Sequence, residues 1–575
     1  MVFMNKEKKL VGLLLVLIVL LGFYLRVHGI NYHSYGDEHF HVYNSLGLIT
    51  GQIPGNFHRI ALFLFYGLFY IVGWVLGIFT DTSDFIGVYF SRMHIFYYAG
   101  RLFESIIGTA AILMLYILGK KMFSRLTGLT ACMFLAVSPV AVEISQKARG
   151  QALCLLLIIA SLTFSYMAIG NKRRYLFYLL SGLCFGAAFS IRVYAGIIVI
   201  PIAFFFFKSE VAKFNSFFNG PFTFNLRKIL FLARKLFVNI GIVILLFSII
   251  ISYILSAPHA IGHFSSYLTS HLATLSIGAE STKIYIGSEF PNSLRYYLTS
   301  GFPRAISLPL YVFSIIILII GIFRFNKKNY APLLLSVILY VVVMGRGSIA
   351  APRYLFPIFP ALFLVAGDVL VITGKRIKIP PLIIFVGAFL LTVPAMRMVI
   401  NQNSRNLQPT TKDIAEEWIF ANLPSGTRIA VESMGYRGPD LKLTPVIDYW
   451  IYNLNEKELK KLLKQRVKQG QPSVALKYFI KYPPTPKYYT KTISVRDVVN
   501  VSELHDSQYQ YIVTSQRNKT IYEKDITRKN YPEHYRARQE FYSWLEERGE
   551  LIKKFLPDSD TPGDELRIYK IRNDR

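Results

Sequence analysis

The chain has 575 residues, of which 53% are hydrophobic and 15% aromatic, with a mean hydropathy of +0.39 and a formal net charge of +30. Apolar runs of about 17 to 22 residues recur up to residue 400, and a run of this length can cross a bilayer. These properties exclude a soluble globular protein and predict a polytopic α-helical membrane protein.

Charged residues divide the chain into two parts. Residues 1–400 contain 34 Lys and Arg but only 11 Asp and Glu, whereas residues 401–575 contain 30 and 23. An excess of Lys and Arg is typical of cytoplasmic loops, so we do not expect nucleic acid as a partner. We predict a transmembrane domain over residues 1–400 and a soluble α/β domain over residues 401–575.

The positions of the basic clusters predict the topology. The N-terminal cluster Lys6–Lys9 is expected in the cytoplasm, and five later clusters then fall on the same side when about eleven spans are assigned. One further apolar run, Ile60–Thr80, must then not cross, and we expect it in the interface or as a re-entrant segment. The expected spans are residues 10–25, 99–118, 126–142, 152–169, 176–190, 194–207, 236–256, 306–323, 331–345, 354–372 and 380–400.

This topology gives two long external loops, residues 26–98 and 257–305, and an external C-terminal domain. We expect the inner membrane of a cell, with membrane lipids around the spans. The tail alternates helix-like and strand-like patterns. Helices are expected at 413–422, 456–468 and 533–547, and strands at 428–432, 474–480, 511–514 and 566–571.

Two adjacent carboxylates, Asp37 and Glu38, follow the first apolar run. Carboxylates are rare in this part of the chain, and an acidic pair at a membrane boundary is costly, so we interpret it as a functional site. Another interpretation is that Asp37 caps a helix beginning at Glu38 and that the pair faces water. On the second span, Glu104 follows Arg101 by three residues, which predicts an ion pair between them.

Several segments together resemble a known family. They are residues 100–108, the end of that span at 115–121, Ser138–Pro139 followed by 146–149, and residues 351–360. In this order, and with Asp37 and Glu38 in the first external loop, they resemble the GT-C glycosyltransferases over residues 5–400. The greatest similarity is to the protein O-mannosyltransferase and aminoarabinose lipid A transferase group, which use polyprenyl-phosphate sugars.

The resemblance implies an enzyme that transfers a hexose or pentose, with inversion, from a polyprenyl-phosphate carrier to a glycan, lipid or protein acceptor on the external face. It implies that Asp37 is the catalytic base and that Glu38 is its neighbour, which orients the acceptor. Such a reaction needs a carboxylate to take the acceptor proton, whereas a lipid phosphate leaves without a protein acid.

Cationic side chains are expected to neutralise the donor phosphate. The candidates are Arg149, Arg353, Arg192, Arg304 and Lys283. Arg149 can instead snorkel at the mouth of its span, and Arg353 can satisfy carbonyls at a helix start broken by proline.

A divalent metal ion is a further interpretation of this face. It would join Asp37 or Glu38 to a loop histidine, with His41, His259 and His263 as candidates, and some GT-C relatives bind such ions. A lone interfacial histidine is more often polar filler, so no cofactor is assigned from the sequence.

Two other functions stay open. A flippase or transporter of lipid-linked glycans should carry charges on both sides of a midplane cavity, whereas here the polar groups gather on one face. A polymerase or ligase that joins lipid-linked glycans would also use polar and charged groups on the external face, so this charge pattern does not exclude it.

Overall fold

The computed structural model describes most of the chain between residues 2 and 572. The residues outside the description are 1, 32–37, 50–59, 212–238, 258–292, 324–328, 347–349, 433–454, 469–475, 477–479, 481–486, 494–497, 507–508, 524–527, 529–531 and 573–575. Asp37, His259, His263 and Lys283 therefore lie outside the described residues.

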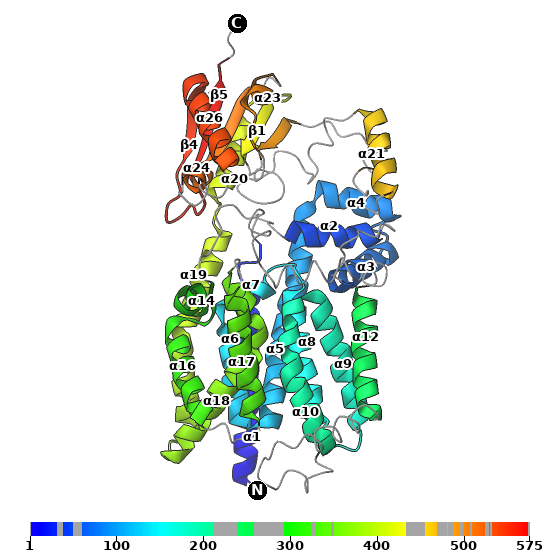
Figure 1. The fold of residues 1–575 in the computed structure, drawn as a ribbon, viewed down its shortest axis with the longest axis vertical. Helices are drawn as coiled ribbons and strands as arrows, with labels where there is room; N and C mark the ends of the chain where they lie inside the picture. Colours follow the sequence, from blue (N-terminus) through cyan, green and yellow to red (C-terminus); the bar gives the residue numbers. More distant parts are fainter. Residues whose placement is uncertain are drawn as a thin grey trace.

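Long apolar helices run side by side and form the lower body of the molecule (Figure 1). They are α1 (Val2–Val27), α5 (Met93–Met122), α6 (Arg125–Val137), α7 (Pro139–Ser145), α8 (Gln151–Met167), α9 (Arg174–Ile191), α10 (Val199–Val211), α12 (Ile240–Ser256), α16 (Leu308–Phe323), α17 (Tyr330–Gly345), α18 (Phe359–Arg376) and α19 (Pro381–Leu407). One large apolar core, centred on α6, α8 and α18, joins them. Leucine, isoleucine and phenylalanine cover the outer faces of several of these helices, as expected where a helix meets lipid.

The described part of the chain contains six helices that are long and apolar enough to cross a membrane, or up to eight if each of two bent pairs is one span. Shorter apolar helices add residues 62–75, 151–167, 240–256 and 330–345. A helix occupies most of each of the expected spans. The structure therefore shows a mostly helical chain with several possible spans, and the expected count of eleven is not confirmed.

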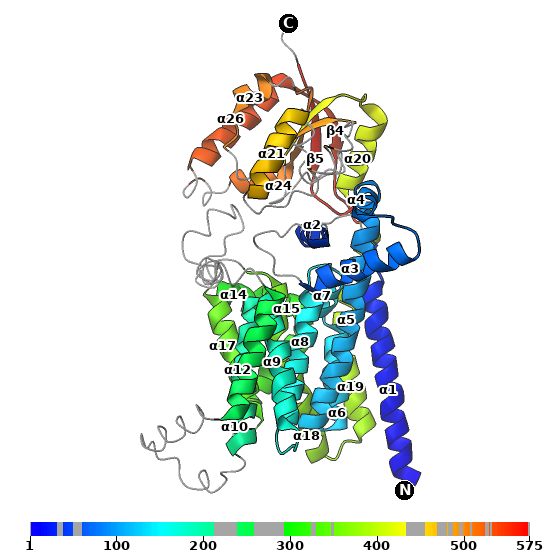
Figure 2. The same ribbon diagram turned by 90° about the vertical axis from the view of Figure 1, so that its right-hand side faces the viewer.

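The described residues of the first loop form three helices at one end of the bundle: α2 (Glu38–Ile49), α3 (Ile60–Val75) and α4 (Thr82–Ser91). In Figure 2, α3 lies across the direction of the long helices. Its Tyr66 hydroxyl donates to the carbonyl of Phe96 (2.6 Å), which fastens α3 to the start of α5. Leu64, Leu68 and Val75 are more than half exposed on its other face. Helix α3 is therefore apolar on both faces, with one face packed against the protein and the other exposed.

Helix breaks lie at the same end of the bundle. Ser138 separates α6 from α7, which are bent by 64°, and its hydroxyl accepts from the Ala141 N–H. Proline at the next position cannot continue the α6 hydrogen-bond ladder. Short turns continue this layer: η1 (Val193–Ile198), α14 (Ser293–Tyr296), η5 (Tyr297–Gly301), α15 (Phe302–Ile306) and η6 (Pro352–Ile358).

The tail contains a five-stranded sheet of order β2-β1-β3-β5-β4, in which β1 pairs in parallel with β2 and β3, and β5 pairs antiparallel with β3 and β4. The strands are β1 (Arg428–Glu432), β2 (Tyr489–Ile493), β3 (Tyr511–Ser515), β4 (Gly549–Phe555) and β5 (Leu566–Ile571). The helices are α20 (Thr411–Asn422), α21 (Glu456–Lys468), α23 (Val501–Asp506), α24 (Gln516–Tyr522) and α26 (Pro532–Arg548).

Most expected tail elements coincide with these, but the sequence analysis missed β2 and β4. The strand expected over 474–480 is wrong at Leu476 and Ile480, which are helical. The other positions of this expected strand lie outside the described residues. Leu476 is buried in a cluster with first-loop residues, so it packs between helices instead of pairing in the sheet.

This cluster, which we call the loop core, joins the tail to the first loop. Leu459 of α21 and Leu476 are buried together with residues of α2, α3, α4, the start of α5, the connection between α3 and α4, and the turn before α8. Those residues are Val42, Tyr43, Leu46, Leu62, Tyr66, Phe79, Phe85, Ile86, Tyr89, Phe96, Tyr97 and Ala148. Folding of the first loop is therefore coupled to part of the tail.

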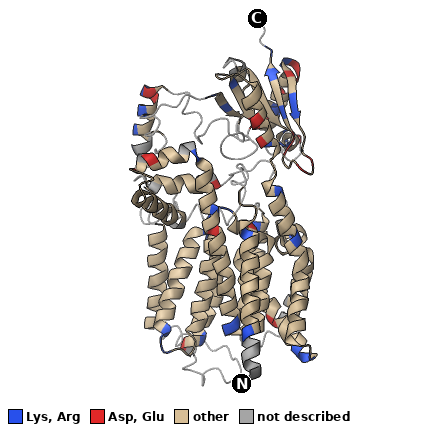
Figure 3. Cartoon of the chain, turned by 180° about the vertical axis from the view of Figure 1, so that it is seen from behind, with Lys and Arg blue, Asp and Glu red and all other residues tan. Residues whose placement is uncertain are grey.

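Lys and Arg mark the end of the bundle opposite the tail (Figure 3). The described clusters there include Lys120–Lys121 at the end of α5 and Lys375–Arg376 at the end of α18. Cations at helix C-termini also interact favourably with the helix dipole.

Candidate functional site

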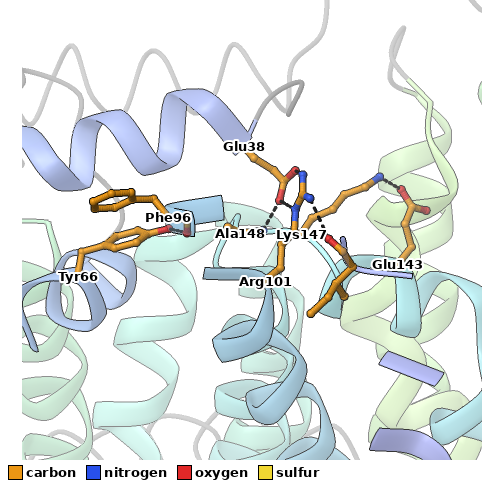
Figure 4. Close-up of polar contacts among 8 residues, drawn as sticks. Glu38, Tyr66, Phe96, Arg101, Glu143, Lys147 and Ala148 are labelled. Atoms are coloured by element: carbon orange, nitrogen blue, oxygen red, sulfur yellow. Dashed lines mark hydrogen bonds and ion pairs between the residues drawn. The ribbon is translucent and has the colours of Figure 1, made fainter. Parts of the chain in front are cut away.

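The site begins with Glu38, the first residue of α2, which is 1% exposed. Arg101 of α5 holds it with a two-pronged ion pair, Nε to Oε1 at 3.0 Å and Nη2 to Oε2 at 2.6 Å. The Ala148 N–H donates to Oε1 at 2.7 Å (Figure 4). Glu38 is therefore enclosed, and it does not face water as the helix-cap interpretation requires.

Arg101 extends this arrangement to the end of α1. Its Nη1 donates to the carbonyl of Ile30 at 2.9 Å, and Arg101 itself is 1% exposed. A buried ion pair is tolerated only when further hydrogen bonds replace the lost water. Here one pair joins the chain after α1, the start of α2, the first turns of α5 and the turn before α8. We call this set, Ile30, Glu38, Arg101 and Ala148, the loop clamp.

The turn at 146–150 is fixed from its other side by Gln146. Its side-chain amide donates to the carbonyls of Leu25 (3.1 Å) and His28 (2.9 Å) and to Asn403 Oδ1 (2.9 Å). Asn403 donates in turn to the Leu25 carbonyl at 2.8 Å. The end of α19, which leads into the tail, is thereby tied to the same turn as the loop clamp.

A second buried cation stabilises the helix break below this turn. Arg26 donates to the carbonyls of Gly22, Ala136 and Leu135 at 2.9 to 3.1 Å and to Ser145 Oγ at 3.2 Å. The last carbonyls of α6 have no intrahelical donor, so the guanidinium satisfies groups that would otherwise be buried unpaired. This residue positions the backbone of the site.

The ion pair expected between Arg101 and Glu104 does not form between these two described residues. Glu104 instead accepts the backbone N–H groups of Gly150 (3.1 Å) and Ala152 (3.0 Å). It thus caps the start of α8, and Arg192 lies close enough to interact with it electrostatically. The i, i+3 spacing predicted the wrong partner because Glu38, distant in sequence, occupies the guanidinium of Arg101.

Four charged groups gather beside the clamped turn. Glu143 forms an ion pair with Lys147 (Figure 4), and Arg149 and Arg353 both lie within electrostatic reach of Glu143. Arg149 is 9% exposed, and the guanidinium of Arg353 lies over the ring of Tyr354 at 5.2 Å. Two of the predicted phosphate-binding cations therefore interact electrostatically with the same carboxylate, although 204 positions separate them in the chain.

The other predicted cations are more scattered. Arg192 ends α9 and is half-buried near Glu104, and Arg304 is exposed in the last turn of α15. Lys283 lies outside the described residues. Arg149 and Arg353 thus share an interaction with Glu143, and no described contact joins Arg304 to either of them.

Three polar side chains near these cations were not singled out by the sequence analysis. Tyr194 of η1, Tyr297 of η5 and Gln151 at the start of α8 each have a buried oxygen without a hydrogen-bond partner of normal geometry among the described residues. Tyr194 also packs edge-on against Tyr354. Tyrosine is so common in this chain that only the fold distinguishes these positions.

The described residues contain no group of three or more His, Cys, Asp and Glu side chains that could hold a metal ion. His41 is 3% exposed on α2, one turn after Glu38. Because Asp37, His259 and His263 are outside the description, the metal prediction stays untested.

A family model described as dolichyl-phosphate-mannose-protein mannosyltransferase matches residues 95–221. No curated protein matches the chain. Among solved structures, ArnT from Cupriavidus metallidurans in the apo state is 11% identical, with 98% of each chain covered and a TM-score of 0.48. The same protein bound to undecaprenyl phosphate is 12% identical, with 97% of each chain covered and a TM-score of 0.47.

The archaeal oligosaccharyltransferase AglB from Archaeoglobus fulgidus, in complex with an inhibitory peptide and a dolichol-phosphate, is also similar. It is 13% identical, with 88% of this chain and 70% of that chain covered and a TM-score of 0.44. The matched residues 95–221 include Arg101, Glu104, Glu143 and Arg149 of the site. Over this part of the chain, the expected resemblance to lipid-phosphate-sugar glycosyltransferases is confirmed.

Proposed function

We propose that this protein is a membrane glycosyltransferase that moves a sugar from a polyprenyl-phosphate carrier to an acceptor at the end of the bundle that bears the tail. One observation carries the proposal. The Glu38 carboxylate binds the Ala148 N–H, so the segment that follows Asp37 lies directly against the residue that precedes Arg149. This contact supports a common site for the predicted base and the predicted phosphate-binding cation, because Asp37 and Arg149 are the chain neighbours of its two partners.

In the proposed reaction, Asp37 handles the proton of the acceptor, and the arginines handle the phosphate of the donor. Asp37 accepts the proton of the acceptor hydroxyl or amine while that oxygen or nitrogen attacks the anomeric carbon of the sugar. The bond from this carbon to the phosphate oxygen breaks, and the lipid phosphate leaves from the opposite face, which inverts the configuration. Arg149 and Arg353 neutralise the phosphate that leaves.

Glu38 serves this reaction as a positioning residue. Both of its oxygens are bound by Arg101, and one also by Ala148, so the start of α2 is fixed relative to α5 and α8. A base must stay within hydrogen-bond distance of the proton it takes, and small misplacements are costly.

The proposal includes the predicted topology: a cytoplasmic N-terminus, eleven spans over residues 1–400 and an external domain over 401–575. It is supported by the cations at the end opposite the tail (Figure 3) and by α3, which lies across the direction of the long helices (Figure 2). A cysteine at exposed Ser425 should react with an impermeant reagent from outside intact cells, and one at exposed Asn171 should not. Labelling in the reverse pattern would contradict both the topology and the site.

The function itself is tested by mass spectrometry of lipid-linked precursors and surface glycans in cells with and without the chain. We expect one polyprenyl-phosphate sugar to accumulate and one glycan to lose the same sugar when the chain is absent. Restoring the wild-type chain should reverse both changes. Unchanged precursors and glycans would contradict the proposal.

A further inference from the structure

The helix α21 carries its lysines and its leucines on opposite sides. At about 100° per residue, Lys457, Lys460, Lys461, Lys464 and Lys468 fall within about 100° of arc. All five are exposed. On the other side, Leu459 is buried in the loop core, and Leu462 and Leu463 pack against it. We call the five lysines the lysine face.

The leucine side fixes the direction in which the lysine face points. Because Leu459 is 7% exposed and anchored among residues of α2 and α4, the opposite side of α21 must point away from the protein. Glu456 forms an ion pair with Lys460 at 2.5 Å, with both side chains more than half exposed. Lysines 457, 461, 464 and 468 have no ion pair with a described residue.

From this geometry we infer that the lysine face binds a polyanionic acceptor chain, one with phosphate or carboxylate groups repeated along its length. This inference rests on the proposed function, because it names the class of acceptor that the same site would use. The five ammonium groups extend over about 16 Å of helix, which suits several successive anionic groups. Lysine is a flexible point charge, so the face suits a repeating chain better than one precisely shaped ligand.

The location of α21 favours an acceptor over a membrane surface. In Figures 1 and 2, α21 lies beyond α2 and α4 as seen from the long helices. The helices α2 and α4 lie between α21 and the ends of the spans, and one helix is about 10 Å across, which is about one Debye length at physiological salt. The charge of lipid headgroups at the ends of the spans is therefore largely screened at the lysine face. The loop core that anchors α21 also contains Ala148 of the loop clamp, so a bound chain would lie above the proposed site.

The test uses the full chain in phosphatidylcholine nanodiscs and labelled inorganic polyphosphate as the probe. In the test variant, Lys457, Lys461, Lys464 and Lys468 become Gln, which leaves the Glu456–Lys460 pair intact. In the control variant, four exposed lysines on the sheet side of the tail, Lys487, Lys553, Lys554 and Lys570, become Gln, so both variants lose the same charge. We expect a loss of affinity of roughly tenfold or more in the test variant, and little change in the control.

Equal losses in both variants would overturn the inference, because net charge alone would then explain binding, and so would unchanged binding in the test variant. Vesicles containing phosphatidylglycerol provide a second arm: if they, and not polyphosphate, lose binding in the test variant, the face binds lipid instead. Asp37→Asn should bind polyphosphate normally. Normal glycan transfer without lysine-dependent binding would reject the lysine face alone, whereas lysine-dependent binding without transfer would reject the proposed function.

Discussion

Two buried Glu–Arg pairs, one in each region of the molecule, show how similar contacts serve different ends. In the loop clamp, Glu38 pairs with Arg101 of a membrane helix. In the tail, Glu432 at the end of β1 pairs with Arg538 of α26 at 2.7 Å, and both side chains are fully buried. Ser515 N–H (3.1 Å) and the Tyr542 hydroxyl (2.6 Å) complete the coordination of Glu432.

The pairs differ in what lies next to them. The tail pair joins a helix to neighbouring strands of one sheet, so its role is to hold that fold together. The loop clamp joins the chain after α1 to α2, α5 and the turn before α8, and its members Glu38 and Ala148 are the chain neighbours of Asp37 and Arg149. Burial of an ion pair therefore does not by itself indicate a functional site. Other charged residues that are neighbours of the pair and have no structural role are what favour a functional interpretation.

The largest effect on activity is expected beside the loop clamp. Asp37→Asn should reduce sugar transfer roughly a hundredfold or more, because Asn keeps the shape of the side chain but cannot accept a proton. The measurement is transfer by the purified full chain, with folding checked by thermal unfolding. Asp81→Asn, in the same loop at the start of α4, is the matched control and should remain active. If Asp37→Asn is active and Glu38→Gln is not, the two roles are exchanged.

Removing the carboxylate from each pair tests the comparison directly. Glu38→Ala and Glu432→Ala each leave a buried guanidinium without its partner, which costs about 3–5 kcal/mol of stability where it is fully enclosed. Glu38→Ala should abolish transfer, and Glu432→Ala should loosen the tail sheet while transfer by the folded fraction persists. Hydrogen exchange of peptides from α2 and β1 would locate each change. Equal loss of transfer in both variants would show that the two pairs do not differ in their importance for activity.

A smaller effect is expected at the predicted phosphate site. Arg149→Lys keeps the charge but loses the two-pronged fork that fits a phosphate, so transfer should fall about tenfold, through weaker donor binding. Titration with a polyprenyl phosphate measures that binding. Arg173→Lys, an exposed residue at the opposite end of the bundle, is the control. Unchanged donor affinity in Arg149→Lys would make Arg149 a structural cation.

The smallest effect is a pH dependence of the tail. Burial raises the pKa of Glu432 above its ordinary value of 4.5, and Arg538 only partly opposes this. The folded state therefore holds the proton of Glu432 more tightly than the unfolded state does. The stability that this proton contributes is complete below pH 4.5 and is lost as pH rises through the raised pKa. Thermal unfolding of the tail, followed by tryptophan fluorescence, should show this decline in the wild type and not in Glu432→Gln. The same decline in both would assign it to another group.

The sequence by itself determined the class of the molecule and much of its local structure. Apolar runs and charge asymmetry predicted a helical membrane body with a mixed tail, and β1, α21 and β5 have the predicted bounds, because local hydrophobic periodicity is a property of neighbouring residues. Strand β4 was missed because Gly, Glu and Lys, which are depleted in strands, supply four of its seven residues. Strand β2 was missed although its Tyr, Thr and Ile favour strands.

Only the tertiary structure decided how the site is assembled. Arg101 pairs with Glu38 across 63 positions instead of with Glu104 three positions away, and Arg149 and Arg353 both interact electrostatically with Glu143. Leu459 and Leu476 pack on the first loop although they belong to the tail. Such contacts depend on which helix ends meet in space, and a helical pattern gives the face of each residue but not its partner on another helix.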